Sequence, residues 1–159
     1  MKKQKRKVGA VVSIKLPNEQ FAYARVLDKA NYAIYDFFTT NEESDVKRIT
    51  SSKILFIISV YDDAGISGRW TNIGFNELEQ DLQSLPFKFI QDKLDPKLFY
   101  LYDPNTGKST PSNFEVCKEL ERAAVWEPEH VEERIVDHLL NRPNIWVEKM
   151  KAKTISPKP

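Results

Sequence analysis

The sequence predicts an α+β fold, in which a curved, mostly antiparallel and partly barrel-like β-sheet carries one main helix near the C-terminus. Three observations support this prediction. Short segments rich in aromatic and β-branched residues fill the first half of the chain, as is typical of strands. One strongly amphipathic segment, residues 128–141, comes late. The chain of 159 residues shows no internal repeat, which favours a single domain.

A hairpin is the best-defined part of the predicted sheet. Residues 21–27 and 32–38 form its two strands, and the Asp and Asn residues between them favour a turn. Side chains alternate across a strand, so that one face of the first strand carries only small side chains and lets another layer pack closely. The residues of this face are Ala22, Ala24 and Val26.

Arg25 is a permanent cation in the middle of the first hairpin strand, on the same face as Tyr23. Two interpretations are open. The stem can cover an aromatic ring while the guanidinium reaches water. Alternatively, the guanidinium is a fixed pair of donors for a carboxylate, either that of Asp36 or one from a partner protein.

The other elements follow from shorter patterns. Residues 8–16 alternate as a half-buried strand does, and residues 54–60 are apolar on both faces, as expected in the middle of a sheet. We predict loops at 39–52, 61–69 and 103–113, short strands at 69–74, 114–121 and 145–150, a hairpin from 87–91 and 98–102, and a short helix over 75–85. Residues 114–121 are also compatible with a helix.

Residues 128–141 form the main predicted helix. Pro128 suits the first helical position, and an apolar stripe through Val131 and Ile135 must dock on the sheet. The opposite face carries polar residues, namely His130, Arg134, Asp137 and Asn141.

The net charge of +1 hides an uneven distribution. Residues 1–7 carry five basic side chains and no acid, and residues 149–159 carry four lysines and no acid. Residues 8–148 carry 15 basic and 23 acidic side chains, a formal net charge of −8. This balance is unlike that of a nucleic-acid-binding fold, and it suits either a basic protein partner or ordinary solubility. We predict a folded core over residues 8–150 between basic tails at 1–7 and 151–159.

Several further features point to a cytoplasmic protein that contacts no membrane. No apolar run approaches the roughly 20 residues that cross a bilayer, and no apolar core of a secretory signal follows the basic start. The single Cys117 cannot form an internal disulfide, which favours a reducing compartment and a buried, inert thiol.

Catalytic and metal-binding patterns are sparse. The two histidines, His130 and His138, lie about 12 Å apart along one predicted helix, too far to share a metal. Residues 61–69 hold acids near glycines, but they lack the EF-hand spacing, so we expect a surface loop rather than a metal site. No phosphate-binding loop is present. We therefore expect no cofactor, although a catalytic carboxylate pair stays open, because it depends on separation in space.

The order of several short motifs resembles the immunity protein 26 family over most of residues 8–148. The opening part of the resemblance lies in Leu16-Pro17, in residues 23–27 (Tyr-Ala-Arg-Val-Leu) and in Tyr35-Asp36. The later part lies in residues 120–131 (Leu-Glu-Arg-Ala-Ala-Val-Trp-Glu-Pro-Glu-His-Val), Arg134-Ile135 and Asp137-His138. The resemblance implies a cytoplasmic, non-enzymatic inhibitor that binds and neutralises a cognate bacterial toxin.

Some relatives carry a phosphotriesterase label, which makes a hydrolase of that type the alternative function. The absence of a histidine-rich metal cluster from the sequence argues against it. The basic ends could also serve a nucleic-acid-associated module, but such runs are more typical of solvated tails, and we predict no nucleic-acid partner. The sequence leaves the oligomeric state open.

Within the inhibitor hypothesis, aromatic and charged residues are the candidates for a shared binding face, because Trp, Tyr and Arg carry most of the energy of protein interfaces. Trp70 and Trp126 could instead fill the core, with Trp126 packing the chain against the sheet just before the helix. The candidate toxin-binding residues are Arg25, Tyr35, Asp36, Trp70, Trp126, Arg134 and Asp137.

Overall fold

The computed structural model describes residues 2–61 and 63–154, which form two compact units. Unit 1 comprises residues 1–83 and 125–144, and unit 2 comprises residues 84–124 and 145–159. The predicted α+β class is confirmed by a mainly antiparallel six-stranded sheet in unit 1 and a three-stranded sheet in unit 2. Neither sheet closes into a barrel within the described residues. That residues 8–150 form a single folded domain stays a prediction.

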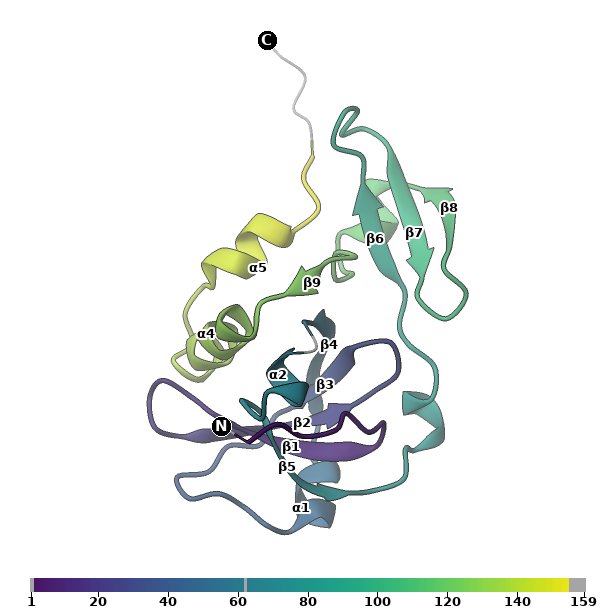
Figure 1. Cartoon of the computed structure of the whole chain (residues 1–159). Helices are drawn as coiled ribbons and strands as arrows, with labels where there is room; N and C mark the ends of the chain where they lie inside the picture. The colour runs from purple at the N-terminus through teal and green to yellow at the C-terminus, as the bar shows by residue number, and fades with distance from the viewer. Residues whose placement is uncertain (1, 62, 155–159) are drawn as a thin grey trace. The chain divides into compact units, whose positions relative to one another are not determined.

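The sheet of unit 1 has the strand order β5-β1-β2-β3-β4-β9 (Figure 1). Neighbouring strands are antiparallel except β4 and β9, which are parallel. The strands are β1 (Ala10–Lys15), β2 (Phe21–Val26), β3 (Asn31–Tyr35), β4 (Ile54–Val60), β5 (Thr71–Phe75) and β9 (Val125–Trp126).

The hairpin predicted from residues 21–38 is confirmed as β2 and β3. Arg25 lies opposite Ala33 in its register, and the turn places Lys29 and Ala30 at φ values of 50° and 60°. Positive φ at both central residues is the geometry that matches the twist of a two-residue hairpin. The Asn31 amide holds this conformation by donating to the carbonyls of Asp28 and Lys29, at 3.2 and 2.9 Å.

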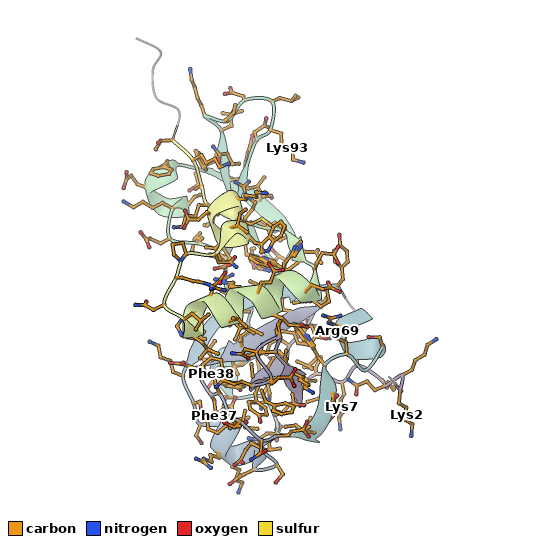
Figure 2. All side chains as sticks on the ribbon, turned by 90° about the vertical axis from the view of Figure 1, so that its left-hand side faces the viewer. Lys2, Lys7, Phe37, Phe38, Arg69 and Lys93 are labelled. Atoms are coloured by element: carbon orange, nitrogen blue, oxygen red, sulfur yellow. The ribbon has the colours of Figure 1, made fainter. Side chains whose placement is uncertain are left out.

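Two helices of unit 1 complete its core. The predicted C-terminal helix is confirmed as α4 (Pro128–Leu139), which lies across one face of the sheet and buries Val131 and Ile135 (Figure 2). The second helix, α1 (Val46–Thr50), lies in the predicted 39–52 loop. The Asp45 side chain caps it by accepting from the Arg48 amide, and its Ile49 packs in a cluster with Val11, Tyr23 and Tyr35.

Strand β4 lies inside the sheet, between β3 and β9, as its continuous apolar run predicted, but its outer side is only partly paired. Its outer neighbour β9 pairs only with Ser59 and Val60. The first four residues of β4 are therefore only partly buried. An apolar run shows that a strand is covered, and it does not show how many strands flank it.

Unit 2 is built on an antiparallel sheet of β6 (Lys88–Gln91), β7 (Phe99–Asp103) and β8 (Lys108–Ser112). The β6–β7 hairpin was predicted, but β8 falls in a predicted loop. It is polar and largely exposed, so that only backbone pairing with β7 defines it as a strand. Cys117 is buried as expected, in a cluster with Phe89 and Phe99.

Four further segments differ from the predicted local structure, although a helix was the open alternative for residues 114–121. Two predicted strands are the helices α3 (Phe114–Cys117) and α5 (Ile145–Met150), and the Asn113 side chain caps α3 by accepting from the Val116 amide. The helix expected over 75–85 reduces to a 3-10 turn, Gln80–Leu82, because Phe75 belongs to β5. A short helix, α2 (Asp63–Ile66), lies in the predicted 61–69 loop.

The first described residues lie against unit 1. The Gln4 side chain donates to the Trp70 carbonyl and accepts from the Asn72 amide, and Arg6 donates to the Leu27 carbonyl at 2.6 Å. The Lys7 ammonium lies 4.1 Å from the centre of the Phe75 ring. In unit 2, the Gln91 amide holds the backbone of Lys153. No helix of residues 2–61 or 63–154 is long and apolar enough to cross a membrane.

The stability of unit 2 should depend on pH through Lys88. This side chain is 3% exposed, and burial lowers its pKa from 10.5 to about 8, although Glu121 acts in the opposite direction. The unfolded chain therefore binds this proton more tightly, so Lys88 opposes folding below pH 8 and ceases to do so as pH rises to 10.5. We expect the free energy of unfolding, relative to Lys88→Met, to rise by about 2–3 kcal/mol over this range.

Urea denaturation of both proteins at several pH values measures this difference. Taking the difference between the two proteins removes the titration of groups that they share. A difference that stays constant between pH 8 and 10.5 would contradict the prediction.

Candidate functional site

The seven predicted site residues fall into two sets on opposite faces of the unit 1 sheet. Arg25 and Tyr35 share the face that packs on α1, since Val11 lies opposite Arg25 and clusters with Tyr35. The others lie on the α4 side: Trp70, Trp126, Arg134 and Asp137 belong to or contact α4, and Asp36 faces its C-terminal end. The structure therefore does not bring all seven residues to one surface.

Arg25 is fully buried, so its guanidinium does not reach water, and it donates to a carboxylate as the second interpretation expected, but to Glu79 in place of Asp36. Its guanidinium donates to the Gly9 carbonyl at 2.9 Å, to the Tyr35 hydroxyl at 3.0 Å, and to the carbonyls of Asn76 and Glu77. The only carboxylate bonded to it among residues 2–61 and 63–154 is that of Glu79, at 3.3 Å, so Asp36 is not its partner.

The hydroxyl of Tyr35 belongs to the same buried group. Burial raises its pKa, and the hydrogen bond from Arg25 acts in the opposite direction. A neutral phenol that only accepts this bond and fills the core explains the position without a reactive role. Arg25 and Tyr35 together fix the loop after β5 onto the sheet.

Trp70 is also fully buried, at the N-terminal end of α4. Its indole nitrogen donates to the Glu132 carboxylate at 3.0 Å, and its ring packs edge-on against Tyr32. Arg69 donates to both oxygens of the same carboxylate, at 2.8 and 2.9 Å, and pairs with Glu129 at 3.2 Å. This group fastens the first turns of α4 to the segment before β5.

Trp126 is 3% exposed and lies beneath an arginine of α4. The Arg134 guanidinium carbon is 3.7 Å from the centre of the Phe56 ring and 5.2 Å from that of Trp126. Such cation–π contacts hold the arginine flat on the aromatic surface. Trp126 therefore fills the core, and Arg134 is the part of this stack that lies nearer to solvent.

The C-terminal end of α4 meets the residues that follow β3. The His138 imidazole lies 3.8 Å from the Asp36 carboxylate, and its ring lies 6.3 Å from the Phe38 ring. Figure 2 shows Phe38 beneath one end of the helix and Arg69 near the other. Asp36, Phe38 and His138 are all at least partly exposed, so they form an accessible polar and aromatic patch.

Asp137 is held by two donors at the same end of the helix. Arg142 and Asn144 both donate to its carboxylate, the latter at 2.8 Å, and these bonds lower its pKa. Beside it is a hollow of about 260 Å³. The hollow is lined by Pro17, Glu133, Val136, Asp137 and Arg142.

The exposed side of α4, with Asp36 and Phe38 beside it, is the candidate site, and we call it the α4 surface. Its residues are Asp36, Phe38, Glu129, Glu133, Arg134, Asp137 and His138. Apart from residues 1–7, unit 1 carries nine basic and 16 acidic side chains, a formal net charge of −7. The acid excess of the chain is therefore concentrated in this unit.

The described residues contain no cluster of three or more His, Cys, Asp or Glu side chains that could hold a metal. Asp62, one of the acids of the 61–69 segment, lies outside them. Sequence reasoning missed Glu79 as a half-exposed counter-ion of Arg25, Glu132 as a buried counter-ion of Arg69, and the Asp36–His138 contact. All three depend on long-range packing and leave no local pattern.

A family model described as Immunity protein 26 matches residues 7–99. The match covers more than half of the chain, from the segment before β1 to the start of β7. The curated proteins and the solved structures gave no match.

Proposed function

The chain belongs to the immunity protein 26 family, and on this premise we propose that it binds and neutralises a cognate bacterial toxin by protein–protein contact, without catalysis. The family match is the single observation that carries the proposal. We further propose that this binding takes place in the cytoplasm, where the buried free thiol of Cys117 is stable.

The charge of unit 1 supports a basic partner. Outside its first seven residues, unit 1 has a formal net charge of −7, and the five cations of residues 1–7 reduce this to −2. The acidic surfaces away from residues 1–7 raise the association rate with a positively charged protein and lower it for an acidic one. The partner contact then depends on salt, because added ions screen charges on exposed surfaces.

The α4 surface is our proposed contact face. Three of the predicted residues lie on it, namely Asp36, Arg134 and Asp137. The helix that carries the surface is held in place by the hydrogen bonds of Glu132 with Arg69 and Trp70. The four remaining candidates, Arg25, Tyr35, Trp70 and Trp126, are buried, and their bonds support a structural role. Whether any of the seven contacts a toxin stays a prediction. No observation favours the phosphotriesterase alternative.

Co-expression with a toxin gene that is encoded next to the gene of this protein tests the function. We expect the chain to restore growth of cells that produce the toxin and to elute with the toxin as a complex. No rescue and no complex would contradict the proposal.

Reversal of charge on the α4 surface tests the contact face. The double variant Asp36→Lys, Glu133→Lys should weaken the complex at least about tenfold, or roughly 1.4 kcal/mol, mainly through slower association at low salt. Binding kinetics at several salt concentrations measure this change. The matched control is Glu77→Lys, Asp81→Lys, which alters two exposed acids of unit 1 after β5. Equal loss in both double variants would show that overall charge matters and that the α4 surface does not.

A further inference from the structure

Unit 2 contains a hollow of about 350 Å³ beside the loop that joins β6 and β7. The residues that line it are Gln91, Asp92, Lys93, Pro96, Arg122 and Lys153. The side chain of Gln91, itself buried, ties the walls together. Its amide nitrogen donates to the carbonyls of Pro96 and Lys153, both at 2.9 Å, and its oxygen accepts from the Lys153 amide at 3.1 Å. The hollow is therefore formed before any ligand binds.

Arg122 is a partly buried cation in the wall of this hollow. Its Nε donates to the Met150 carbonyl at 2.9 Å, one Nη donates to the Lys151 carbonyl at 3.3 Å, and the guanidinium lies over the Phe89 ring. No carboxylate of the described residues lies within 4.0 Å of it. Burial lowers the pKa of Arg122. The remaining guanidinium N–H groups are available to an anion.

The other charged side chains give the lining of the hollow a net positive charge. Lys93 and Lys153 are exposed, and neither forms an ion pair within the described part of the chain. The one acid in the lining, Asp92, points one oxygen at its own loop, where it accepts from the amides of Leu94 and Asp95, both at 2.8 Å. Three cations and one carboxylate give the lining a formal net charge of +2.

We propose that this hollow of unit 2 binds a terminal phosphate group, either inorganic phosphate or a phosphomonoester at the end of a small molecule. A phosphomonoester carries a charge of about −1.5 to −2 at pH 7, which matches the lining, whereas each phosphodiester carries only about −1. Arginine offers phosphate a planar pair of donors, and lysine adds mobile point charges. The volume lies at the small end of ligand sites, which span roughly 300–1,000 Å³. The site lies outside the α4 surface and does not depend on toxin binding.

Titration of the full-length protein with inorganic phosphate, followed by NMR at constant ionic strength, tests the proposal. We expect saturable shifts of the Gln91 side-chain amide and of the backbone amides of Lys93 and Lys153. The affinity for a nucleoside monophosphate should fall as pH drops below about 6, where the phosphomonoester dianion gains a proton. A nucleoside monophosphate should bind at the same amides, and a dinucleotide that contains only a phosphodiester should bind at least about tenfold more weakly.

Two double variants distinguish phosphate binding in the hollow from general attraction of phosphate by the positive charges of unit 2. Lys93→Gln, Lys153→Gln removes two cations of the hollow and should weaken phosphate binding about tenfold. Lys97→Gln, Lys108→Gln removes two exposed lysines of unit 2 outside the hollow and should change the affinity less than about twofold. Arg122 is left intact because it also holds the segment after α5. No saturable shift, an equal effect of both variants, or equal affinity for the diester would overturn the proposal.

Discussion

Replacement of Arg25 by alanine should lower the free energy of unfolding by about 3–5 kcal/mol, because each buried acceptor left without a donor costs about 1–3 kcal/mol. The guanidinium is fully buried and serves three backbone carbonyls, the Tyr35 hydroxyl and the Glu79 carboxylate. Removal leaves these acceptors without their donor in a space that water does not readily fill. The loop from Asn76 to Glu79 then loses its main attachment to the sheet.

Urea denaturation followed by tryptophan fluorescence measures this change. The matched control is Arg48→Ala, because Arg48 is an exposed arginine of the same unit that pairs with Glu43 at 3.4 Å. Surface pairs of this kind contribute about 0–1 kcal/mol. A second variant, Arg25→Lys, keeps the charge without the planar set of donors. It should also destabilise the protein, because lysine cannot reach all of these acceptors. A cost for Arg25→Ala no larger than that of the control would contradict the prediction.

Glu132→Ala should have the second large effect, about 3 kcal/mol of unfolding free energy. The carboxylate is almost fully buried and accepts two hydrogen bonds from Arg69 and one from the Trp70 indole. Its loss leaves the buried Trp70 indole donor without its acceptor and removes two hydrogen bonds from Arg69, which keeps its pair with Glu129. Glu132→Gln keeps the shape and removes the charge, so it should cost less, about 1–3 kcal/mol.

The control variant changes Glu129, which lies one helical turn before Glu132 and pairs with the same arginine, Arg69. Glu129 pairs with Arg69 at 3.2 Å but is exposed, so Glu129→Gln should cost less than about 1 kcal/mol. Equal costs for Glu129→Gln and Glu132→Gln would show that burial of the carboxylate is unimportant. The comparison also bears on function. Glu132→Ala should reduce toxin protection by unfolding the protein, whereas reversal of exposed charges on the α4 surface should reduce it with stability retained.

The sequence was most informative where the local pattern was long. The β2–β3 hairpin and α4 were predicted correctly because strand alternation and helical periodicity each extended over many residues. Short segments were ambiguous. Residues 114–117 form a helix because Asn113 caps it, and β8 is a strand because β7 supplies its hydrogen bonds. Neither partner is visible in the composition of the segment itself.

The candidate site was less predictable than the fold, for a physical reason. Arg25 was singled out from the sequence, but its counter-ion Glu79 is 54 positions away and meets it only through the packing of the loop after β5. Trp126 and Arg134 were chosen separately, and the structure stacks one on the other. The side-chain types in the sequence identified residues that form strong interactions. It did not distinguish interactions made inside the protein from those available to a partner.

The bonds of Gln4 bear on how the unit 1 sheet meets other chains. β5 is the outermost strand on its side, and an unprotected outermost strand offers backbone groups that another polypeptide can pair with. The side-chain amide of Gln4 donates to the carbonyl of Trp70 and accepts from the N–H of Asn72, as the backbone of a neighbouring strand would. Gln4 thereby occupies two backbone groups at this border that a second chain would need in order to extend the sheet there.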